Sequence, residues 1–176
     1  MTIDLKSLIR TIPDYPRRGI RFRDISTLLT DPAGFGDAVE RMVSLAPRDI
    51  DLVAGIEARG FLFAGAMAAR LDAGVLMIRK SGKLPGPAMG ADYALEYGAD
   101  RLEMHQNSVP KDARVLIVDD LIATGGTAIA ATKLIESAGG ECAGAVFLID
   151  LPDLGGAARL RDSGLDVHAL IEFEGE

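Results

Sequence analysis

Short, almost uniformly apolar runs recur along the chain and alternate with stretches of helical periodicity. These runs occupy residues 52–56, 75–78, 114–118, 143–149 and 167–173. A strand that is apolar on both sides is buried on both faces, as in a parallel sheet covered by helices. We therefore predict the α/β class, with a mostly parallel central sheet flanked by helices and right-handed crossovers.

The stretches between these runs predict the helices. Helical stretches are expected at residues 61–71, 128–137 and 157–162. Another helix should begin at Asp31, an N-cap residue, because Pro32 suits the first helical position. The N-terminal segment is also predicted to be an amphipathic helix that ends before Pro13, because its apolar residues follow i, i+3, i+4, i+7 spacing: Leu5, Leu8, Ile9 and Ile12.

One segment interrupts the alternation. Residues 80–87 have the composition of a loop, and residues 93–97 and 102–106 alternate as in a β-hairpin. A long arm inserted into a compact domain is usually functional. We expect one domain over residues 1–176, with an inserted flexible hairpin lid at about 80–106 and an N-terminal hood segment.

Charge and cysteine content exclude several classes of protein. Acidic residues outnumber basic ones 26 to 19, for a net charge of −7, whereas binding to nucleic-acid phosphates requires a basic surplus. The single cysteine, Cys142, excludes an intramolecular disulfide and a cysteine-based zinc cluster. There is no secretory signal pattern and no apolar run near the ~18 residues of a membrane span. We expect a cytoplasmic protein without nucleic-acid or membrane partners.

The most informative motif lies at residues 115–127, Val-Leu-Ile-Val-Asp-Asp-Leu-Ile-Ala-Thr-Gly-Gly-Thr. It predicts a buried strand that ends in Asp119 and Asp120, then a short loop, then a helix N-terminus. Ligands of open α/β sheets bind at the carboxyl ends of strands, and a glycine-rich turn at a helix N-terminus suits a phosphate monoester. Two carboxylates beside a phosphate need neutral or cationic partners, such as ribose hydroxyls and Mg²⁺.

A simpler interpretation is that the acids cap the helix and the glycine pair only makes a turn. The complete string favours a phosphate site over this interpretation. Neither a P-loop nor a dinucleotide-binding glycine pattern is present.

This motif resembles the phosphoribosyl pyrophosphate (PRPP) motif of type I phosphoribosyltransferases. Three further strings, at residues 19–26, 57–61 and 79–86 with 95–98, occur in the same order in the adenine phosphoribosyltransferases. The resemblance covers nearly the whole chain.

The resemblance implies a role for each part of the site. The 5′-phosphate would lie on Ala123, Thr124, Gly125, Gly126 and Thr127, with Asp119 and Asp120 on the ribose side. Pyrophosphate would be bound by a turn and by the lid, through Glu57, Ala58, Arg59, Arg79, Lys83 and Tyr97, and Arg79 would serve a neighbouring subunit's site. Adenine would lie on Ile20, Arg21, Phe22 and Arg23. Mg²⁺ would be held mainly by PRPP, with Asp119 and Asp120 contributing through water.

Two positions bear on the choice of base. In relatives that use 6-oxopurines, an acidic residue stands where this chain has Ala123, which cannot transfer a proton. Glu96, on the lid, matches the carboxylate that handles N7 of adenine in the family; the alternative is that Glu96 is one more solvated acid. Arg21 stands where a small apolar residue is more usual.

The implied reaction is adenine plus PRPP giving AMP plus pyrophosphate, through an oxocarbenium-like transition state, in a homodimer. Glu96, Asp119 and Asp120 are the candidate catalytic residues. Two alternatives stay open at this point. One is a phosphoribosyltransferase for another purine or pyrimidine, and the other is a PRPP-sensing regulatory protein of the same fold.

Overall fold

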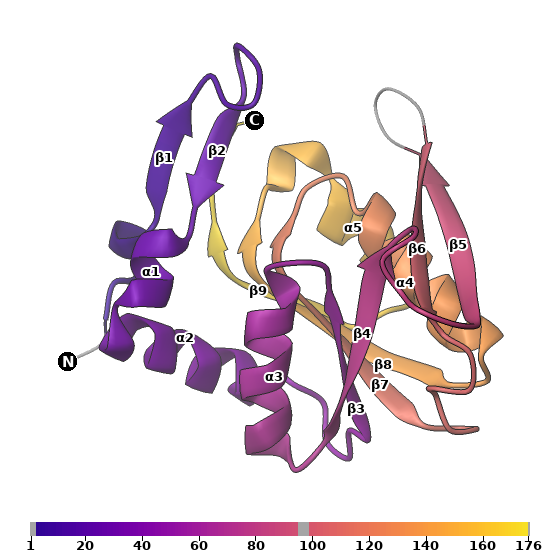
Figure 1. Ribbon diagram of the computed structural model, residues 1–176. Helices are drawn as coiled ribbons and strands as arrows, with labels where there is room; N and C mark the ends of the chain where they lie inside the picture. Colours follow the sequence, from indigo (N-terminus) through magenta and orange to yellow (C-terminus); the bar gives the residue numbers. More distant parts are fainter. Residues whose placement is uncertain (1–2, 95–98, 176) are drawn as a thin grey trace.

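The computed structural model describes residues 3–94 and 99–175. It has a seven-stranded central sheet with the strand order β5-β6-β4-β3-β7-β8-β9 (Figure 1). The strands are β3 (Leu52–Ile56), β4 (Gly74–Lys80), β5 (Ala88–Ala94), β6 (Ala99–His105), β7 (Arg114–Ile122), β8 (Glu141–Asp150) and β9 (Val167–Glu172). Strands β4, β3, β7, β8 and β9 run parallel, while β6 pairs antiparallel with both β4 and β5. The predicted class, a mostly parallel α/β sheet, is confirmed.

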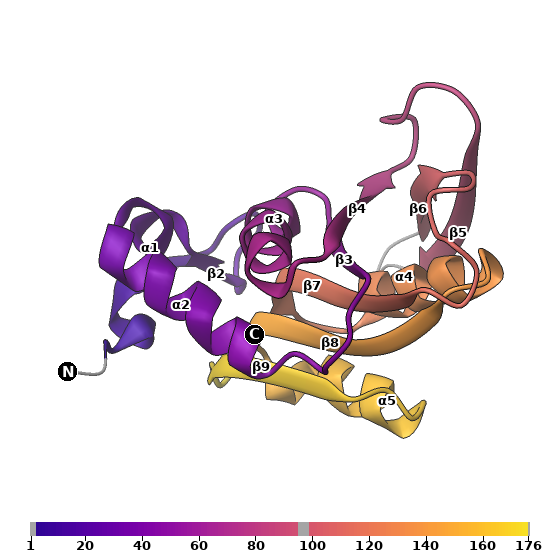
Figure 2. The same cartoon turned by 90° about the horizontal axis from the view of Figure 1, so that it is seen from below.

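Helices cover both faces of this sheet. The helices are α1 (Ser26–Thr30), α2 (Pro32–Ser44), α3 (Gly60–Leu71), α4 (Gly126–Ser137) and α5 (Gly156–Asp162), with a short 3₁₀ turn, η2, at Pro152–Leu154. Neighbouring residues of β7 belong to different cores: Leu116 packs with α2 and α3, and Ile117 packs with α4 and α5. Figures 1 and 2 show these helix pairs on opposite sides of the sheet. This explains why the parallel strands are apolar at successive positions.

Helix α2 begins as predicted. The Asp31 side chain accepts a hydrogen bond from the Gly34 N–H at 2.7 Å, and Pro32 occupies the first turn. The helix buries an apolar stripe that includes Val39 and Met42 against the sheet.

The predicted N-terminal helix over residues 5–12 is wrong. Residues Leu5–Leu8 form a single 3₁₀ turn, η1, and Arg10–Pro13 form strand β1, which pairs antiparallel with β2 (Arg21–Asp24). Leu5 and Ile9 are buried as expected, but Ile12 is 38% exposed and lies opposite Phe22. A segment this short is a marginal helix, and pairing with β2 satisfies its backbone instead.

This N-terminal hairpin, residues 10–24, stands beside the central sheet and close to the C-terminus (Figure 1). Its buried Arg23 lies over the Phe173 ring, 4.3 Å from the centroid, and donates to the Glu174 carbonyl at 3.3 Å. The chain ends therefore hold each other in place.

The predicted hairpin of the inserted arm is confirmed in its described strands. Both strands begin earlier than predicted, β5 at Ala88 where residue 93 was expected and β6 at Ala99 where residue 102 was expected, and Ala94 pairs with Ala99. The hairpin extends the central sheet through β6, and Leu102 and Met104 are fully buried against it. Within the described ranges, no helix is both long and apolar enough to cross a bilayer.

Candidate functional site

Two strand ends meet at the centre of the sheet. Strands β3 and β7 are parallel neighbours, so the turn at residues 57–60 lies beside the acid pair Asp119–Asp120. A Cβ atom on Gly60 would come within 2.8 Å of Asp119 Oδ1 and 2.9 Å of the Val118 carbonyl oxygen. The turn approaches the acid pair this closely only because residue 60 has no side chain.

Strand β7 continues past the acid pair, which the sequence was expected to place at its end. Pairing with β8 extends to Ile122 opposite Asp150, so the backbone stays extended. The two carboxylates therefore project from the last part of a strand that is hydrogen-bonded to β8. The predicted phosphate loop, residues 123–127, starts directly after this strand.

The carboxylates of the acid pair lie close together, so the negative charge of Asp120 disfavours ionisation of Asp119. Burial, followed by repulsion from the Asp120 carboxylate, raises the pKa of Asp119 well above its usual value. Asp120 is only 5% exposed, and its Oδ2 atom lies 2.7 Å from Arg59 Nε. The two groups are not aligned for a hydrogen bond, and Asp120 Oδ2 has no hydrogen-bond partner among the described residues. This atom is left to accept from a hydroxyl or from hydrated metal.

Arg59 connects the acid pair with the predicted adenine region. Its guanidinium carbon lies 5.2 Å from the centroid of the Phe22 ring, a cation–π distance. Phe22 in turn packs edge-on against Tyr15. One arginine thus contacts both the buried carboxylate and an aromatic surface.

The other residues of the predicted adenine region differ in their surroundings. Arg23 is buried and donates to Thr11 Oγ1 at 2.6 Å, so its side chain holds the hairpin and does not face the acid pair. The Arg21 guanidinium packs against Gly175, and Ile20 is 38% exposed.

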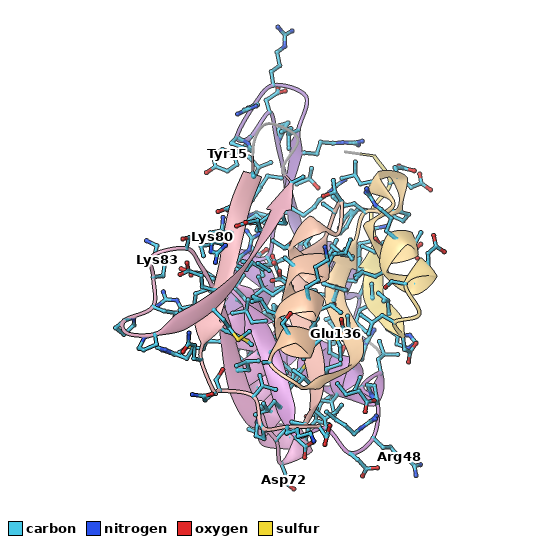
Figure 3. The ribbon with its side chains drawn as sticks, turned by 90° about the vertical axis from the view of Figure 1, so that its right-hand side faces the viewer. Tyr15, Arg48, Asp72, Lys80, Lys83 and Glu136 are labelled. Atoms are coloured by element: carbon cyan, nitrogen blue, oxygen red, sulfur yellow. The ribbon has the colours of Figure 1, made fainter. Side chains whose placement is uncertain are left out.

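Glu57 connects the turn to the arm. Its carboxylate accepts from Arg79 Nε at 3.2 Å, from Arg79 Nη2 at 3.3 Å and from the Lys80 N–H at 3.0 Å. Burial raises the pKa of Glu57, but the Lys80 N–H and the Arg79 guanidinium outweigh it, so the pKa is lowered overall. In this chain Arg79 is therefore bound to Glu57, and it also donates to the Lys83 carbonyl. The Lys83 side chain is exposed at the outer edge of the arm (Figure 3).

The predicted phosphate loop has the order of elements that the motif predicts, a glycine-rich turn followed by a helix N-terminus. Gly125 adopts φ +81°, a left-handed conformation that favours glycine, and α4 begins at Gly126. A cavity of about 470 Å³ lies beside the loop and contains Thr124 and Gly126 in its wall, together with Tyr93 and Ala94 of the arm. N–H groups in the first turn of a helix lack helical partners, so the start of α4 has the chemistry that suits an anion.

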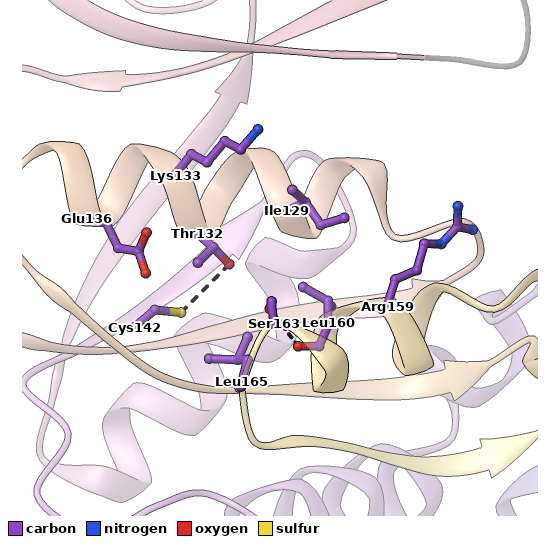
Figure 4. Close-up of a pocket in the computed structure, with 10 residues that line it drawn as sticks. Ile129, Thr132, Lys133, Glu136, Cys142, Arg159, Leu160, Ser163 and Leu165 are labelled. Carbon is purple, nitrogen blue, oxygen red and sulfur yellow. Dashed lines mark hydrogen bonds between the residues drawn. The ribbon is translucent and has the colours of Figure 1, made fainter.

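A second cavity, of about 340 Å³, lies between α4 and α5 (Figure 4). Ile129, Leu160, Leu165 and Cys142 line it, with charged side chains at its edge. It contains no residue that the sequence assigned to the site.

The predicted site residues are not all described. Glu96 and Tyr97 lie outside the described residues, so their roles stay predictions. Ala58 is in the turn, joined to Glu57 by a cis peptide bond. Two contacts of the site were not predicted from the sequence: the ion pair of Asp120 with Arg59 and the close approach of Gly60 to Asp119. For the approach of Gly60, the local signal in the sequence was a glycine between a strand and a helix.

Comparison with known proteins gives consistent matches. The phosphoribosyl transferase domain family matches residues 27–168. The chain is 54% identical to an adenine phosphoribosyltransferase of Sphingopyxis alaskensis, over 99% of this chain and 95% of that protein. It is similar to the crystal structure of the adenine phosphoribosyltransferase from Thermoanaerobacter pseudethanolicus, with a TM-score of 0.92 and 46% identity over 97% of this chain and 98% of that one. The yeast (Saccharomyces cerevisiae) adenine phosphoribosyltransferase, solved with adenine and an imino-altritol bisphosphate, matches with a TM-score of 0.88 and 35% identity over 96% of this chain and 97% of that one.

Proposed function

The chain belongs to the phosphoribosyltransferase family, and we propose from this premise that it is a purine-salvage transferase. It converts adenine and PRPP to AMP and pyrophosphate. The observation that carries this conclusion is the similarity to adenine phosphoribosyltransferases over almost its whole length. The acid pair beside a phosphate loop, at the carboxyl ends of parallel strands, is the geometry that such a reaction needs.

In the proposed mechanism the chain's residues hold two reactants in line. The phosphate loop binds the 5′-phosphate of PRPP through N–H groups at the start of α4, and Asp119 and Asp120 accept from the ribose hydroxyls. Arg59 faces the leaving pyrophosphate and balances its charge. The bond from C1 to the pyrophosphate oxygen breaks as the bond from C1 to N9 of adenine forms, so no protein nucleophile is needed. Positioning and charge stabilisation supply the rate.

The proton on adenine must leave as N9 is glycosylated. We assign this role to Glu96, because Ala123 has no titratable group: the Glu96 carboxylate accepts the proton from N7 of the 7H tautomer as the lone pair of N9 forms the bond to C1. Tyr97 and Lys83 belong to the same lid, which closes over the site and excludes water.

The residues present fit Mg²⁺ held mainly by the substrate. Among residues 3–94 and 99–175, no group of three histidine, cysteine or carboxylate side chains is placed to hold a metal. Mg²⁺ usually keeps waters and substrate phosphates as ligands. Asp120 Oδ2 is ion-paired with Arg59 but accepts no hydrogen bond from these residues, so it is suited to bind such a water, with Asp119 beside it. When bound, the ion would neutralise part of the pyrophosphate charge. Chelation by EDTA should stop turnover and leave the melting temperature of the ligand-free protein unchanged.

We further propose that the protein is a homodimer formed through α3 and β4. Leu62, Val75 and Met77 are each nearly half exposed on these elements, and they adjoin Arg79. A partner that covers this patch would bring Arg79 to the subunit boundary, as the family resemblance implies. Sedimentation of the parent and of Val75→Glu at micromolar concentration tests this: the variant should shift toward monomer.

We propose that the whole chain, residues 1–176, acts as one phosphoribosyltransferase domain in the cytoplasm. With a net charge of −7 it should bind neither nucleic acid nor anionic membranes.

One experiment tests the reaction directly. The protein is incubated with Mg²⁺, PRPP and one nucleobase at a time, and any nucleotide is identified by mass. AMP should form from adenine, and hypoxanthine, guanine, xanthine and orotate should give no comparable product. A product from another base would assign the protein to a sibling activity. No product from any base, with retained PRPP binding and DNA binding, would support a regulatory protein.

A further inference from the structure

The first residue of α5 touches the phosphate loop. The Gly156 N–H donates a hydrogen bond to the Ala123 carbonyl oxygen at 3.0 Å. Gly156 is buried and lies far along the chain from the motif at residues 115–127. The loop is therefore bounded on one side by a backbone segment that the motif does not include.

This contact leaves no room for a side chain at position 156. A Cβ atom there would lie 2.6 Å from the Gly125 nitrogen and 2.8 Å from the Thr124 carbonyl carbon, and it would be closer still to the Ala123 oxygen. The contact is reciprocal, because a Cβ atom on Gly125 would come within 3.0 Å of the Gly156 oxygen. These neighbours are backbone atoms, which cannot rotate away as a side chain can.

Space is the reason for glycine at 156, while conformation is the reason at 155. Gly155 has φ +71°, in the left-handed region, and Gly156 lies outside that region. An alanine at 156 can therefore adopt the backbone conformation present, and its only conflict is with the loop.

The hydrogen bond from Gly156 also sets the direction of a loop N–H group. In a trans peptide the carbonyl and the following N–H point in opposite directions. With the Ala123 carbonyl turned toward α5, the Thr124 N–H is turned away from α5. On the loop's other flank, a Cβ atom on Gly126 would lie 3.3 Å from the Ala94 carbonyl oxygen.

The side chains of Leu160 and Ile129 face the cavity of about 340 Å³ that lies between α4 and α5 (Figure 4). A change at Gly156 therefore acts on the loop more than on the packing of the two helices.

We propose that Gly156 is a positioning residue for the 5′-phosphate loop, holding its N–H groups in the direction that binds the phosphate of PRPP. The proposal rests on the proposed function and extends it to a residue outside the PRPP motif.

The test is Gly156→Ala, with Gly36→Ala as the matched control. Gly36 lies in α2, is exposed and has open space at its Cβ position, so the control adds the same methyl group without a clash. For Gly156→Ala we expect the KM for PRPP to rise at least tenfold and the affinity for ribose 5-phosphate to fall by a similar factor. The KM for adenine and the affinity for pyrophosphate should stay within twofold. For Gly36→Ala all four values should match the parent.

A purely structural role would lower the melting temperature and the amount of active protein without separating these constants. An unchanged KM for PRPP in folded Gly156→Ala, or equal losses for PRPP and adenine, would overturn the proposal.

If Gly156→Ala does not fold, amide hydrogen exchange measured on the parent protein tests whether Gly156 positions the loop. Ribose 5-phosphate should slow exchange of the Gly156 N–H at least fivefold and leave the Leu160 N–H unchanged, because only the former bonds to the loop. An unchanged Gly156 rate at saturation would refute the proposal. Failure of the proposed function is recognised separately, since the parent would then form no AMP.

Discussion

Asp120→Asn tests whether the acid pair acts on the substrate directly or by positioning Arg59. The carboxylate is 7% exposed at its side chain and lies 2.7 Å from Arg59 Nε, whose own side chain is 43% exposed. A hydrogen bond to a charged group contributes about 1.5–3 kcal/mol, which is an upper limit for a pair that is not aligned as a hydrogen bond, and an exposed ion pair contributes about 0.2–1 kcal/mol. A half-exposed pair should fall between these limits, at about 1–2 kcal/mol.

This range corresponds to a fall in kcat/KM for PRPP of about 5- to 30-fold for Asp120→Asn, because 1.4 kcal/mol is tenfold. A double-mutant cycle with Arg59→Met isolates the coupling between the two residues. Initial rates of AMP formation with PRPP varied at saturating adenine give the four kcat/KM values. We expect a coupling energy of about 1 kcal/mol or more.

Glu40→Gln is the control for removing an ion pair as such. Glu40 and Arg70 are also 2.7 Å apart, but their side chains are 54% and 62% exposed and lie on α2 and α3, away from the acid pair. The kcat/KM of Glu40→Gln for PRPP should stay within twofold of the parent value. If Asp120→Asn and Arg59→Met were additive to within about 0.3 kcal/mol, Asp120 would act independently of Arg59 and the reasoning would be wrong.

Four further predictions follow from the site and its surroundings. Because the raised pKa of Asp119 means that the folded protein holds this proton more tightly, stability should fall as the pH rises above about 4. Asp119→Asn should therefore melt at a higher temperature than the parent at pH 7 while turning over more slowly; a lower melting temperature would contradict this. Thr127→Ala should weaken PRPP binding by roughly 1–3 kcal/mol in a calorimetric titration, with adenine binding retained. Hydrogen bonds from Ser26, together with Arg10, lower the pKa of Asp24 to about 2. The ionised Asp24 therefore contributes fully to stability above about pH 4, and this contribution is lost as the pH falls toward 2. The melting temperature of Asp24→Asn should depend less on pH across this range than that of the parent. Glu96→Gln should lower kcat with adenine by more than about threefold, since a positioned acid or base contributes about 10²- to 10⁴-fold, and should hardly affect the poor turnover of a 7-deaza analogue.

Local patterns determined much of the fold. The runs at β3, β4, β7, β8 and β9 were recognisable because a strand buried on both faces must be apolar at successive positions, and this is visible without knowing its neighbours. The start of α2 was likewise predictable, because Asp31 is a preferred N-cap residue and Pro32 suits the first helical position. The phosphate loop followed from the order of acids, hydroxyls and glycines, whose chemistry is read directly from residue types.

The N-terminal segment shows where local patterns fail. Leu5, Leu8, Ile9 and Ile12 have helical spacing, yet Ile12 lies in a strand because β2 is available to pair with β1. Similarly, β7 runs past the acid pair because β8 continues beside it to Asp150. Backbone hydrogen bonds between distant segments override a short periodic signal.

The sequence by itself determined the class of the fold, the location of the phosphate loop and the family to which the chain is similar. Only the tertiary structure decided that Arg59 meets Asp120 and Phe22, that Arg79 is bound by Glu57, and that Gly156 contacts the loop at residues 123–127. Residue types and their spacing report burial and local conformation, because those properties depend on near neighbours in the chain. Which charges pair, and which glycines must lack a side chain, depends on segments that come together only when the sheet and its helices have formed.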